Sequence, residues 1–395
     1  MTLHEITLGV FYVGNKHPER VLFDELIPLP DGTTYNSYLI RGSDKTVLID
    51  TVDPEKKDEL LSKLESLGVE NIDYVVANHA EQDHSGTLPE ILEKYPTAKI
   101  LATEKCAEFL CELLPVKPDQ FRAVADGEEI SLGGKTLKFI HAPWVHWPET
   151  MLTYLMEDKT LFPCDLFGSH LSQDELFVKD FSKVEKSAKR YYAEIMMPFR
   201  AMIKGHLEKI KSIEFDLIAP SHGPIYKNPQ DIIGAYQKWV SDEVENKVVI
   251  AYVSMHGSTQ KIVEHLSKEL ADRGIEVKSF RITQDDIGEL AMELVDAATI
   301  VLATPTVLVG PHPQMVYATY VANLLRPKAR FATIIASYGW AGQAVEKLSA
   351  MLTNLNAEVL PSTVVRGSPN EDDCSALCAL SDKILEKHKS IGLIK

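Results

Sequence analysis

Four potential metal ligands lie close together in the segment His79-Ala-Glu81-Gln-Asp83-His84. Imidazole nitrogens and carboxylate oxygens are donors that proteins offer to zinc and iron. Their offsets of 0, 2, 4 and 5 would point the four side chains around most of a helix. We therefore predict that an irregular loop carries them and turns them toward one point. A polar loop without a metal is the competing interpretation, and four donors in six residues argue against it.

There are three further candidates, and two of them follow apolar runs that predict strands. His146 lies in the segment Trp-Val-His-Trp-Pro-Glu, Asp165 comes directly after the run Thr160–Cys164, and His222 comes shortly after the run Phe215–Ala219. Strand ends are where α/β folds place their chemistry. Together the candidates are four histidines and three carboxylates, a set that suits two metal ions with one carboxylate between them.

The elements that would position these residues alternate between strand-like and helix-like patterns. A short buried strand is predicted at Tyr74–Asn78, before the ligand loop. After the loop, Thr87-x-x-Glu90 predicts a capping box, with Pro89 in the first turn of a helix. The other expected elements are strands at Tyr38–Ile40 and Thr46–Thr51, a helix at Glu55–Leu67, strands from Ser131 to Leu155 with a turn at Gly133–Gly134, and helices from Lys183 to Ile213.

A second pattern begins near Asn246, where five short apolar strands alternate with helices. The predicted strands are Lys247–Val253, Ile275–Ile282, Ala298–Ala303, Phe331–Ala336 and Glu358–Val365, and a helix follows the first strand to Asp272. Such alternation predicts a parallel sheet covered on both faces, and this number of units fits a flavodoxin-like doubly wound fold. We place the boundary in the polar stretch 243–247, which gives domains of residues 1–246 and 247–395.

The turn after the first of these strands is a candidate phosphate site. It consists of Ser254, Met255, His256, Gly257, Ser258 and Thr259. Glycine and small hydroxyl residues let backbone N–H groups converge on a phosphate at a helix N-terminus, although simple helix capping gives the same pattern. The segment is neither a P-loop nor G-x-G-x-x-G, so ATP and dinucleotides are disfavoured. It lies where a flavodoxin holds the FMN phosphate.

Two later segments would flank the flavin ring at the carboxyl edge of the sheet. The first is Thr304-Pro305-Thr306-Val307, expected as a loop after the third strand. The second follows the fourth strand and reads Ser337-Tyr338-Gly339-Trp340-Ala341-Gly342. Trp340 or Tyr338 is a candidate to stack on the ring, and packing against the neighbouring loop is the alternative for both.

Length, charge and cysteine content exclude several classes. The 395 residues are enough for two domains, and the formal net charge of −16 argues against nucleic acid and anionic membranes as main partners. No apolar run approaches the roughly 18 residues of a membrane span, and the start of the chain has no signal-peptide pattern. The five cysteines form no C-x-x-C motif, which predicts reduced thiols and a cytoplasmic location.

The ordered ligand set resembles the metallo-β-lactamase fold as flavodiiron proteins use it, and the resemblance covers nearly the whole chain. It implies an N-terminal metallo-β-lactamase-like αββα sandwich followed by the flavodoxin-like domain. Hydrolases of this fold have a histidine where this chain has Glu81, and a harder carboxylate ligand shifts the preference from zinc toward iron. The family pattern implies one iron at His79, Glu81 and His146, the other at Asp83, His84 and His222, and a bridge at Asp165.

A dimetal site together with FMN indicates redox chemistry, because FMN takes up electrons singly or in pairs and a diiron centre can pass them to a small oxidant. The resemblance implies reduction of dioxygen to water, of nitric oxide to nitrous oxide, or both. It also implies a head-to-tail homodimer or a dimer of such dimers. We expect a separate electron donor, either a rubredoxin-like protein or a reduced deazaflavin, since no rubredoxin or flavin-reductase sequence follows the fifth helix.

Other residues carry weaker expectations. His170 resembles a histidine near the diiron pocket of some members, and we expect it either to orient or protonate the bound substrate or to be structural. His141 matches no ligand position, so we expect it to support a ligand or the fold. The family often has asparagine after the Pro-Thr pair, where this chain has Val307–Gly310. Side-chain hydrogen bonds to the flavin ring are therefore expected to be missing or replaced by backbone ones, which affects the flavin potential.

Two other functional classes remain open at this point. One is a zinc-dependent hydrolase with an accessory flavodoxin domain, which Glu81 argues against. The other is an electron-transfer flavoprotein in which the metal site is structural, and a closed site without exchangeable positions would favour it.

Overall fold

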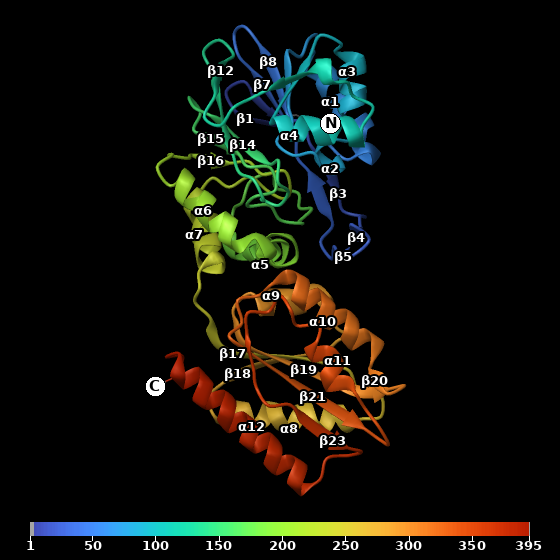
Figure 1. The fold of residues 1–395 in the computed structure, drawn as a ribbon. Coiled ribbons are helices and arrows are strands. Elements are labelled where there is room, and N and C mark those ends of the chain that lie inside the picture. Colours follow the sequence, from blue (N-terminus) through green and yellow to red (C-terminus); the bar gives the residue numbers. More distant parts are fainter. Residues whose placement is uncertain (1–3, 395) are drawn as a thin grey trace. The chain divides into compact units, whose positions relative to one another are not determined.

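The computed structural model describes residues 4–394, which form two compact units that divide the chain after Val240 (Figure 1). The second unit also includes Ala193–Pro198. The predicted boundary at 243–247 lies near this division, where the first strand of the second unit begins. No helix within residues 4–394 is both long and apolar enough to cross a membrane.

Two sheets form the first unit. One contains β1 (His4–Thr7), β2 (Val10–Tyr12), β7 (Tyr38–Arg41), β8 (Thr46–Ile49), β9 (Tyr74–Val76), β10 (Lys99–Ala102) and β11 (Phe121–Ala123), in that order. The other contains β12 (Glu129–Ser131), β13 (Thr136–His141), β14 (Met151–Leu155), β15 (Thr160–Phe162) and β16 (Leu217–Ile218). Two ribbons are added, β3 (Asn15–His17) with β6 (Thr33–Tyr35) and β4 (Leu22–Phe23) with β5 (Ile27–Pro28).

Apolar side chains from the inner faces of both sheets pack into one core, to which Ile40 of β7 and Phe139 of β13 belong. The helices of this unit are α1 (Lys57–Ser66), α2 (Gln82–Ser85), α3 (Leu88–Lys94), α4 (Glu104–Leu113), α5 (Phe181–Tyr191), α6 (Arg200–Ile210) and α7 (Pro229–Val240). Short helical turns lie at Pro54–Lys56 and Pro118–Gln120, and two more, Tyr192–Met196 and Met197–Phe199, contain the residues Ala193–Pro198 that are grouped with the second unit. Helices α1, α3 and α4 cover the outer face of the first sheet through a second core. The fold is therefore two packed sheets with helices outside, as predicted.

The second unit is a parallel sheet with the strand order β18-β17-β19-β21-β22, and β23 also pairs with β21. Its strands are β17 (Glu245–Tyr252), β18 (Glu276–Arg281), β19 (Ala297–Val307), β20 (Gly310–Pro311), β21 (Phe331–Tyr338), β22 (Glu358–Val359) and β23 (Thr363–Arg366). Helices α8 (Ser258–Asp272) and α12 (Glu371–Ser390) cover one face, whereas α9 (Ile287–Leu294), α10 (Pro313–Leu325) and α11 (Ala344–Ser349) cover the other (Figure 1). The predicted doubly wound fold is confirmed.

Several local predictions are wrong. The ligand loop is only partly irregular, because Asp83 and His84 lie on α2. Thr87 precedes α3 but forms no capping box, because its hydroxyl donates to the carbonyl oxygen of Val52 at 2.7 Å. The predicted strand Glu358–Val365 is divided into β22 and β23 around Pro361, which has no backbone N–H for the ladder.

The expected loop Thr304–Val307 is the end of β19, which continues into a hairpin with β20. The polar and small residues of this segment still pair with neighbouring strands, so composition alone did not reveal the extension. The turn of the hairpin consists of Leu308 and Val309, which have φ values of 47° and 67°. The Leu308 side chain is 91% exposed.

Candidate metal centre and flavin site

Strand ends and loops of the first unit bring the seven predicted ligands to one place. His79 and Glu81 lie in the loop after β9, Asp83 and His84 lie on α2, His146 lies between β13 and β14, Asp165 follows β15, and His222 follows β16. Both sheets thus contribute ligands. The candidate ligands lie three to five residues after a strand or on α2, so their positions do not depend on one long loop.

Four of these side chains form one group, in which all donor atoms lie within 4.8 Å of one another. Oε2 of Glu81 lies 3.1 Å from Nε2 of His79 and 3.1 Å from Nε2 of His146. Oδ2 of Asp165 lies 3.6 Å from Nε2 of His79 and 3.4 Å from Nε2 of His146. Two nitrogens and two carboxylates therefore surround one point.

The other group consists of Asp83, His84 and His222. Oδ2 of Asp83 lies 3.1 Å from Nε2 of His222, and Oδ1 lies 3.3 Å from Nε2 of His84. Oδ1 of Asp165 faces the same group, at 2.9 Å from Nε2 of His84 and 3.4 Å from Nε2 of His222. Asp165 therefore turns one oxygen toward each group, which is how a bridging carboxylate is arranged.

Several of the donor atoms have no hydrogen-bond partner, as expected for atoms that coordinate metal ions. Among residues 4–394, no partner of hydrogen-bond geometry exists for either carboxylate oxygen of Asp83 and Asp165 or for Nε2 of His84 and His222, all of which are buried. A buried polar atom without a partner is destabilising by about 1–3 kcal/mol, which coordination would offset. Imidazole and carboxylate donors suit iron, and they suit zinc as well.

Charge crowding shifts the protonation of these groups. Burial disfavours the charged imidazole of His146, but Asp165 and Glu81 outweigh it and raise the pKa of His146 to about 9. In the same way, Asp165 and Asp83 overcome burial and raise the pKa of His222 to about 10. Burial opposes ionisation of Asp165, yet the histidines around it hold its pKa well below the usual range. Protons on the histidines thus balance the carboxylates, and metal cations would take their place.

Glu149 supports His79 from behind, a role that sequence analysis missed. Oε1 of Glu149 accepts a hydrogen bond from Nδ1 of His79 at 2.6 Å and another from the backbone N–H of Ala80 at 3.0 Å. The carboxylate is fully buried. A carboxylate that binds the far nitrogen of a ligand histidine fixes both the tautomer and the ring orientation. Its place three residues after His146 was the available signal.

The loop around His222 is fixed by backbone contacts. Nδ1 of His222 donates to the carbonyl oxygen of Thr34 at 2.6 Å, so Nε2 faces the other ligands. The next residue, Gly223, has a φ of 78°, and a Cβ there would lie 2.1 Å from Oγ of Ser169. Only glycine fits this turn. The predicted ligand and the glycine beside it therefore form one structural unit.

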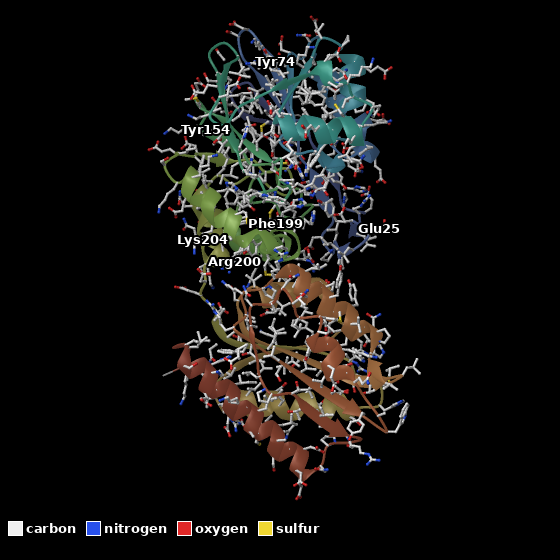
Figure 2. All side chains as sticks on the ribbon, in the orientation of Figure 1. Glu25, Tyr74, Tyr154, Phe199, Arg200 and Lys204 are labelled. Atoms are coloured by element: carbon white, nitrogen blue, oxygen red, sulfur yellow. The ribbon has the colours of Figure 1, made fainter. Side chains whose placement is uncertain are left out.

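A cavity of about 250 Å³ reaches the candidate metal ligands Glu81 and Asp83 from the surface. Phe23, Tyr35 and Trp147 provide aromatic parts of its wall. On another side, the ring of Phe199, labelled in Figure 2, lies 6.4 Å from that of His146. The candidate centre is therefore flanked by aromatic rings and reached through a cavity of small-molecule size, whose wall also carries Arg20, Asp24 and Asp53.

His170 lies beside the candidate ligands and is not one of either group. Its Nδ1 is 2.9 Å from the hydroxyl of Thr33, and its ring centroid is 5.0 Å from that of His222. Nε2 is buried without a partner. Burial, together with His222, lowers the pKa of His170 well below its usual value. A neutral imidazole can orient a bound molecule, and it carries no extra proton to donate.

Two other residues near the predicted site differ in their environment. Sγ of Cys164 lies within 4.8 Å of donor atoms of His84 and Asp165, a proximity that sequence analysis did not anticipate. Burial raises the pKa of this thiol well above its usual value, so it is protonated.

His141 is outside both groups, and its Nε2 donates to the carbonyl oxygen of Val124 at 3.0 Å. His141 thus supports the fold.

In the second unit, parts of all three predicted flavin segments line one cavity of about 220 Å³. The lining residues are Met255, His256, Ser258, Thr259, Pro305, Thr306, Ser337, Tyr338, Gly339 and Gly367. Pro305 of β19 is paired with Ser337 of β21, and the hydroxyls of Thr259 and Ser337 are 2.9 Å apart. A neighbouring cavity of about 390 Å³ shares Thr306 and Tyr338. The carboxyl edge of the sheet thus carries two cavities with shared lining residues, which together are called the hollow.

Not every predicted flavin residue reaches these cavities. Gly342 lines the second one, whereas Ser254, Gly257, Val307, Trp340 and Ala341 line neither. Gly257 instead shapes the turn before α8 with a φ of 89°. Trp340 is 78% exposed, which contradicts packing against the neighbouring loop. Gly367, which sequence analysis missed, follows β23 at the same edge of the sheet, and its place after a strand was the available signal.

Comparisons with known proteins agree with this architecture. A family model described as "ODP family beta lactamase" matches residues 33–223, which include all seven predicted ligands. The chain is 35% identical to a nitric oxide reductase of Moorella thermoacetica, over 96% of this chain and 97% of that protein. It is 32% identical to a coenzyme F420H2 oxidase of Methanothermobacter marburgensis, over 87% of this chain and 89% of that protein. The structure of rubredoxin oxygen:oxidoreductase from Desulfovibrio gigas matches with a TM-score of 0.94 at 28% identity, over 98% of this chain and 99% of that one.

Proposed function

Because this chain belongs to the flavodiiron proteins, we propose that its seven-residue cluster binds two iron ions and, with FMN in the second unit, reduces dioxygen or nitric oxide. The chain is an oxidoreductase of this family. The relatives are named for oxidation and reduction, so they do not favour the zinc-hydrolase alternative.

The observation that carries the proposal is the orientation of Asp165. One carboxylate oxygen approaches His79 and His146, and the other approaches His84 and His222. A buried carboxylate shared by two donor groups is suited to two cations close together. A single structural ion would leave one group of buried donors uncompensated.

When bound, the two irons would supply redox-active positions for the oxidant, and FMN would supply electrons singly or in pairs. The residues of the chain would position the metal ligands and the bound molecule. Glu149 holds His79 with Nε2 toward the centre. The aromatic side chains of Phe23, Tyr35 and Trp147 would contact the oxidant in the cavity. His170 is proposed to orient the bound molecule through its neutral Nε2, and the protons that the reduction consumes would come from water in the cavity.

The hollow at the sheet edge of the second unit is proposed to hold FMN. Ser258 and Thr259 open α8, where backbone N–H groups would receive the phosphate. Pro305, Thr306 and the Ser337–Gly339 segment would flank the ring. The exposed side chain of Leu308 offers no hydrogen bond to the flavin, so backbone groups of the β19–β20 hairpin are proposed to replace the family's asparagine contacts.

The electron donor and the assembly are also part of the proposal. Related proteins are named for rubredoxin and for coenzyme F420H2, and a donor of either chemistry, protein or reduced deazaflavin, is proposed here. A head-to-tail dimer would set the flavin of one copy near the metal centre of the other.

Metal and flavin content of the anaerobically purified protein tests the proposal. We expect two irons and one FMN per chain by elemental analysis and by flavin released on denaturation. Zinc that exchanges poorly for iron, or failure to retain added FMN, would contradict it.

A further inference from the structure

A second cluster of metal-binding side chains lies in the other unit, away from the seven-residue cluster. Helices α8 and α12 pack side by side on one face of the sheet (Figure 1). His265 and Glu269 are four residues apart on α8 and therefore share a face of that helix. Cys378 approaches them from α12. The donor atoms of the three side chains all lie within 4.8 Å of one another.

The geometry within this cluster is close to that of an occupied site. Sγ of Cys378 lies 3.9 Å from Nε2 of His265. In a tetrahedral zinc site, bond lengths of ~2.3 Å to sulfur and ~2.0 Å to nitrogen place these two atoms ~3.5 Å apart. The carboxylate of Glu269 also faces this thiol, with a donor oxygen within 4.8 Å of Sγ. All three side chains are partly buried, so only small adjustments would bring them onto one ion.

Neighbouring charges hold the carboxylate of Glu269 in place. Nη1 of Arg273 lies 2.7 Å from Oε2 of Glu269, and Nε of Arg273 lies 2.8 Å from Oδ1 of Asp382. Arg273 thus links α8 to α12 one turn beyond the cluster. A carboxylate oxygen can accept a further partner besides Arg273. The ion pair therefore orients Glu269 in the manner of a group that supports a metal ligand.

We propose that His265, Glu269 and Cys378 form a binding site for Zn²⁺, with water as the fourth ligand. A sulfur, a nitrogen and an oxygen donor suit zinc, whereas magnesium and calcium prefer oxygen donors alone. Binding replaces the thiol proton, which goes to solvent, and no electron is transferred. The zinc affinity should therefore increase with pH. The site is independent of the proposed oxidoreductase chemistry.

The consequence would reach the flavin region. Helix α8 begins at Ser258, which lines the proposed flavin cavity, and His265 lies two turns further along the same helix. An ion shared by α8 and α12 would brace the helix whose N-terminus faces the flavin. Zinc binding is thus expected to stabilise the second unit against unfolding, because it favours the folded state alone.

Zinc X-ray absorption spectroscopy of the iron-loaded, FMN-containing protein tests the site directly. After one equivalent of Zn²⁺ is added without oxygen, we expect a sulfur shell at ~2.3 Å. This shell should be lost in Cys378→Ser. It should persist in Cys374→Ser, which removes a thiol one turn earlier on α12 and outside the cluster. A spectrum with nitrogen and oxygen neighbours only, or a sulfur shell that survives in Cys378→Ser, would overturn the proposal.

Calorimetric titration with Zn²⁺ provides a second measurement. His265→Gln should weaken zinc binding at least tenfold and leave the iron and FMN contents unchanged. Equal affinity of His265→Gln and the unchanged protein would also overturn the site. Because iron and FMN are measured on the same samples, failure of the zinc site and failure of the proposed oxidoreductase function give different results.

Discussion

The candidate metal centre and the candidate flavin site are built in opposite ways. The metal centre consists of charged side chains that are almost entirely buried and come from strand ends of two sheets. The flavin hollow lies at one sheet edge and is lined by small, hydroxyl and backbone groups, several of them partly exposed. The first site depends on residue identity, whereas the second depends on backbone shape. Substitutions should therefore affect the two sites differently.

The largest effect is expected from Asp165→Ala. Loss of the shared carboxylate leaves each ligand group without one oxygen, so iron content should fall below two per chain while FMN content stays unchanged. Reoxidation of the reduced protein should slow by more than about 100-fold, since changes to groups that merely support ligands already cause 10- to 100-fold losses. Elemental analysis and stopped-flow absorbance measure both. Asp174→Ala, at an exposed position of the same unit, is the control, and full iron content in Asp165→Ala would refute the bridge.

The free energy of unfolding of the second unit should decrease in acid, for a reason that involves neither cofactor. Burial lowers the pKa of His388 to about 4, and its ring lies between Thr299 and Asn246. The unfolded chain binds this proton near pH 6.5 and the folded one only near pH 4. Stability should therefore be full above pH 6.5 and fall by up to about 3 kcal/mol as the pH drops to 4.

Urea unfolding across this pH range, with flavin fluorescence as the probe, measures the effect. His388→Gln should flatten the pH dependence, whereas Lys389→Gln, at an exposed position of the same helix, should keep it. An identical slope in His388→Gln and the unchanged protein would show that another group carries the acid sensitivity.

A smaller effect on the metal centre is expected from Glu149→Ala. His79 would lose the acceptor for its Nδ1, so iron affinity should fall by about 10- to 100-fold. Competition with a chelator measures this change, and the Mössbauer spectrum should show one iron altered more than the other. Glu129→Ala is a suitable control, because Glu129 is exposed and pairs only with Lys138 on the surface. Unchanged affinity together with a normal spectrum would mean that Glu149 has no positioning role.

The smallest effect is expected from Gly257→Ala. A Cβ at this position would lie more than 4 Å from the neighbouring atoms of the described chain. The free-energy cost of the substitution therefore arises only from the φ of 89°. Left-handed backbone costs a residue with a side chain about 1–2 kcal/mol, which corresponds to FMN binding weaker by about 5- to 30-fold. Fluorescence titration with FMN measures it. Gly274→Ala, with a φ of 75° and open space, imposes the same strain away from the cavity and should leave FMN affinity unchanged. If both variants bind FMN equally, the turn at Gly257 is not part of the site.

The same contrast explains what could be predicted from sequence. His79, Glu81, Asp83 and His84 are recognisable because four donors in one short segment are rarely incidental. The doubly wound fold followed from alternating strands and helices. These features depend on local residue types, which a sequence displays directly.

Features that depend on distant partners could not be predicted. Glu149 is distinguished only by its contact with His79, 70 residues earlier in the chain. The predicted capping box at Thr87 does not form, because the Thr87 hydroxyl donates its hydrogen bond to the carbonyl oxygen of Val52. In the second unit, the sequence of Thr304–Val307 is typical of a loop, but pairing with β20 and β21 makes the segment part of a strand. Gly367 lines the hollow because β23, which precedes it, ends at the same edge of the sheet. Tertiary context decided each of these positions.

The central claim is that electrons from the flavin leave through iron at the seven-residue cluster. Stopped-flow reoxidation of the reduced protein by dioxygen and by nitric oxide, with iron or with zinc in the first unit, tests it most directly. The account predicts that iron-loaded protein is reoxidised much faster than zinc-loaded protein by at least one of the two oxidants. Equal rates for the two metal forms with both oxidants would contradict it, because the flavin alone would then account for the reaction.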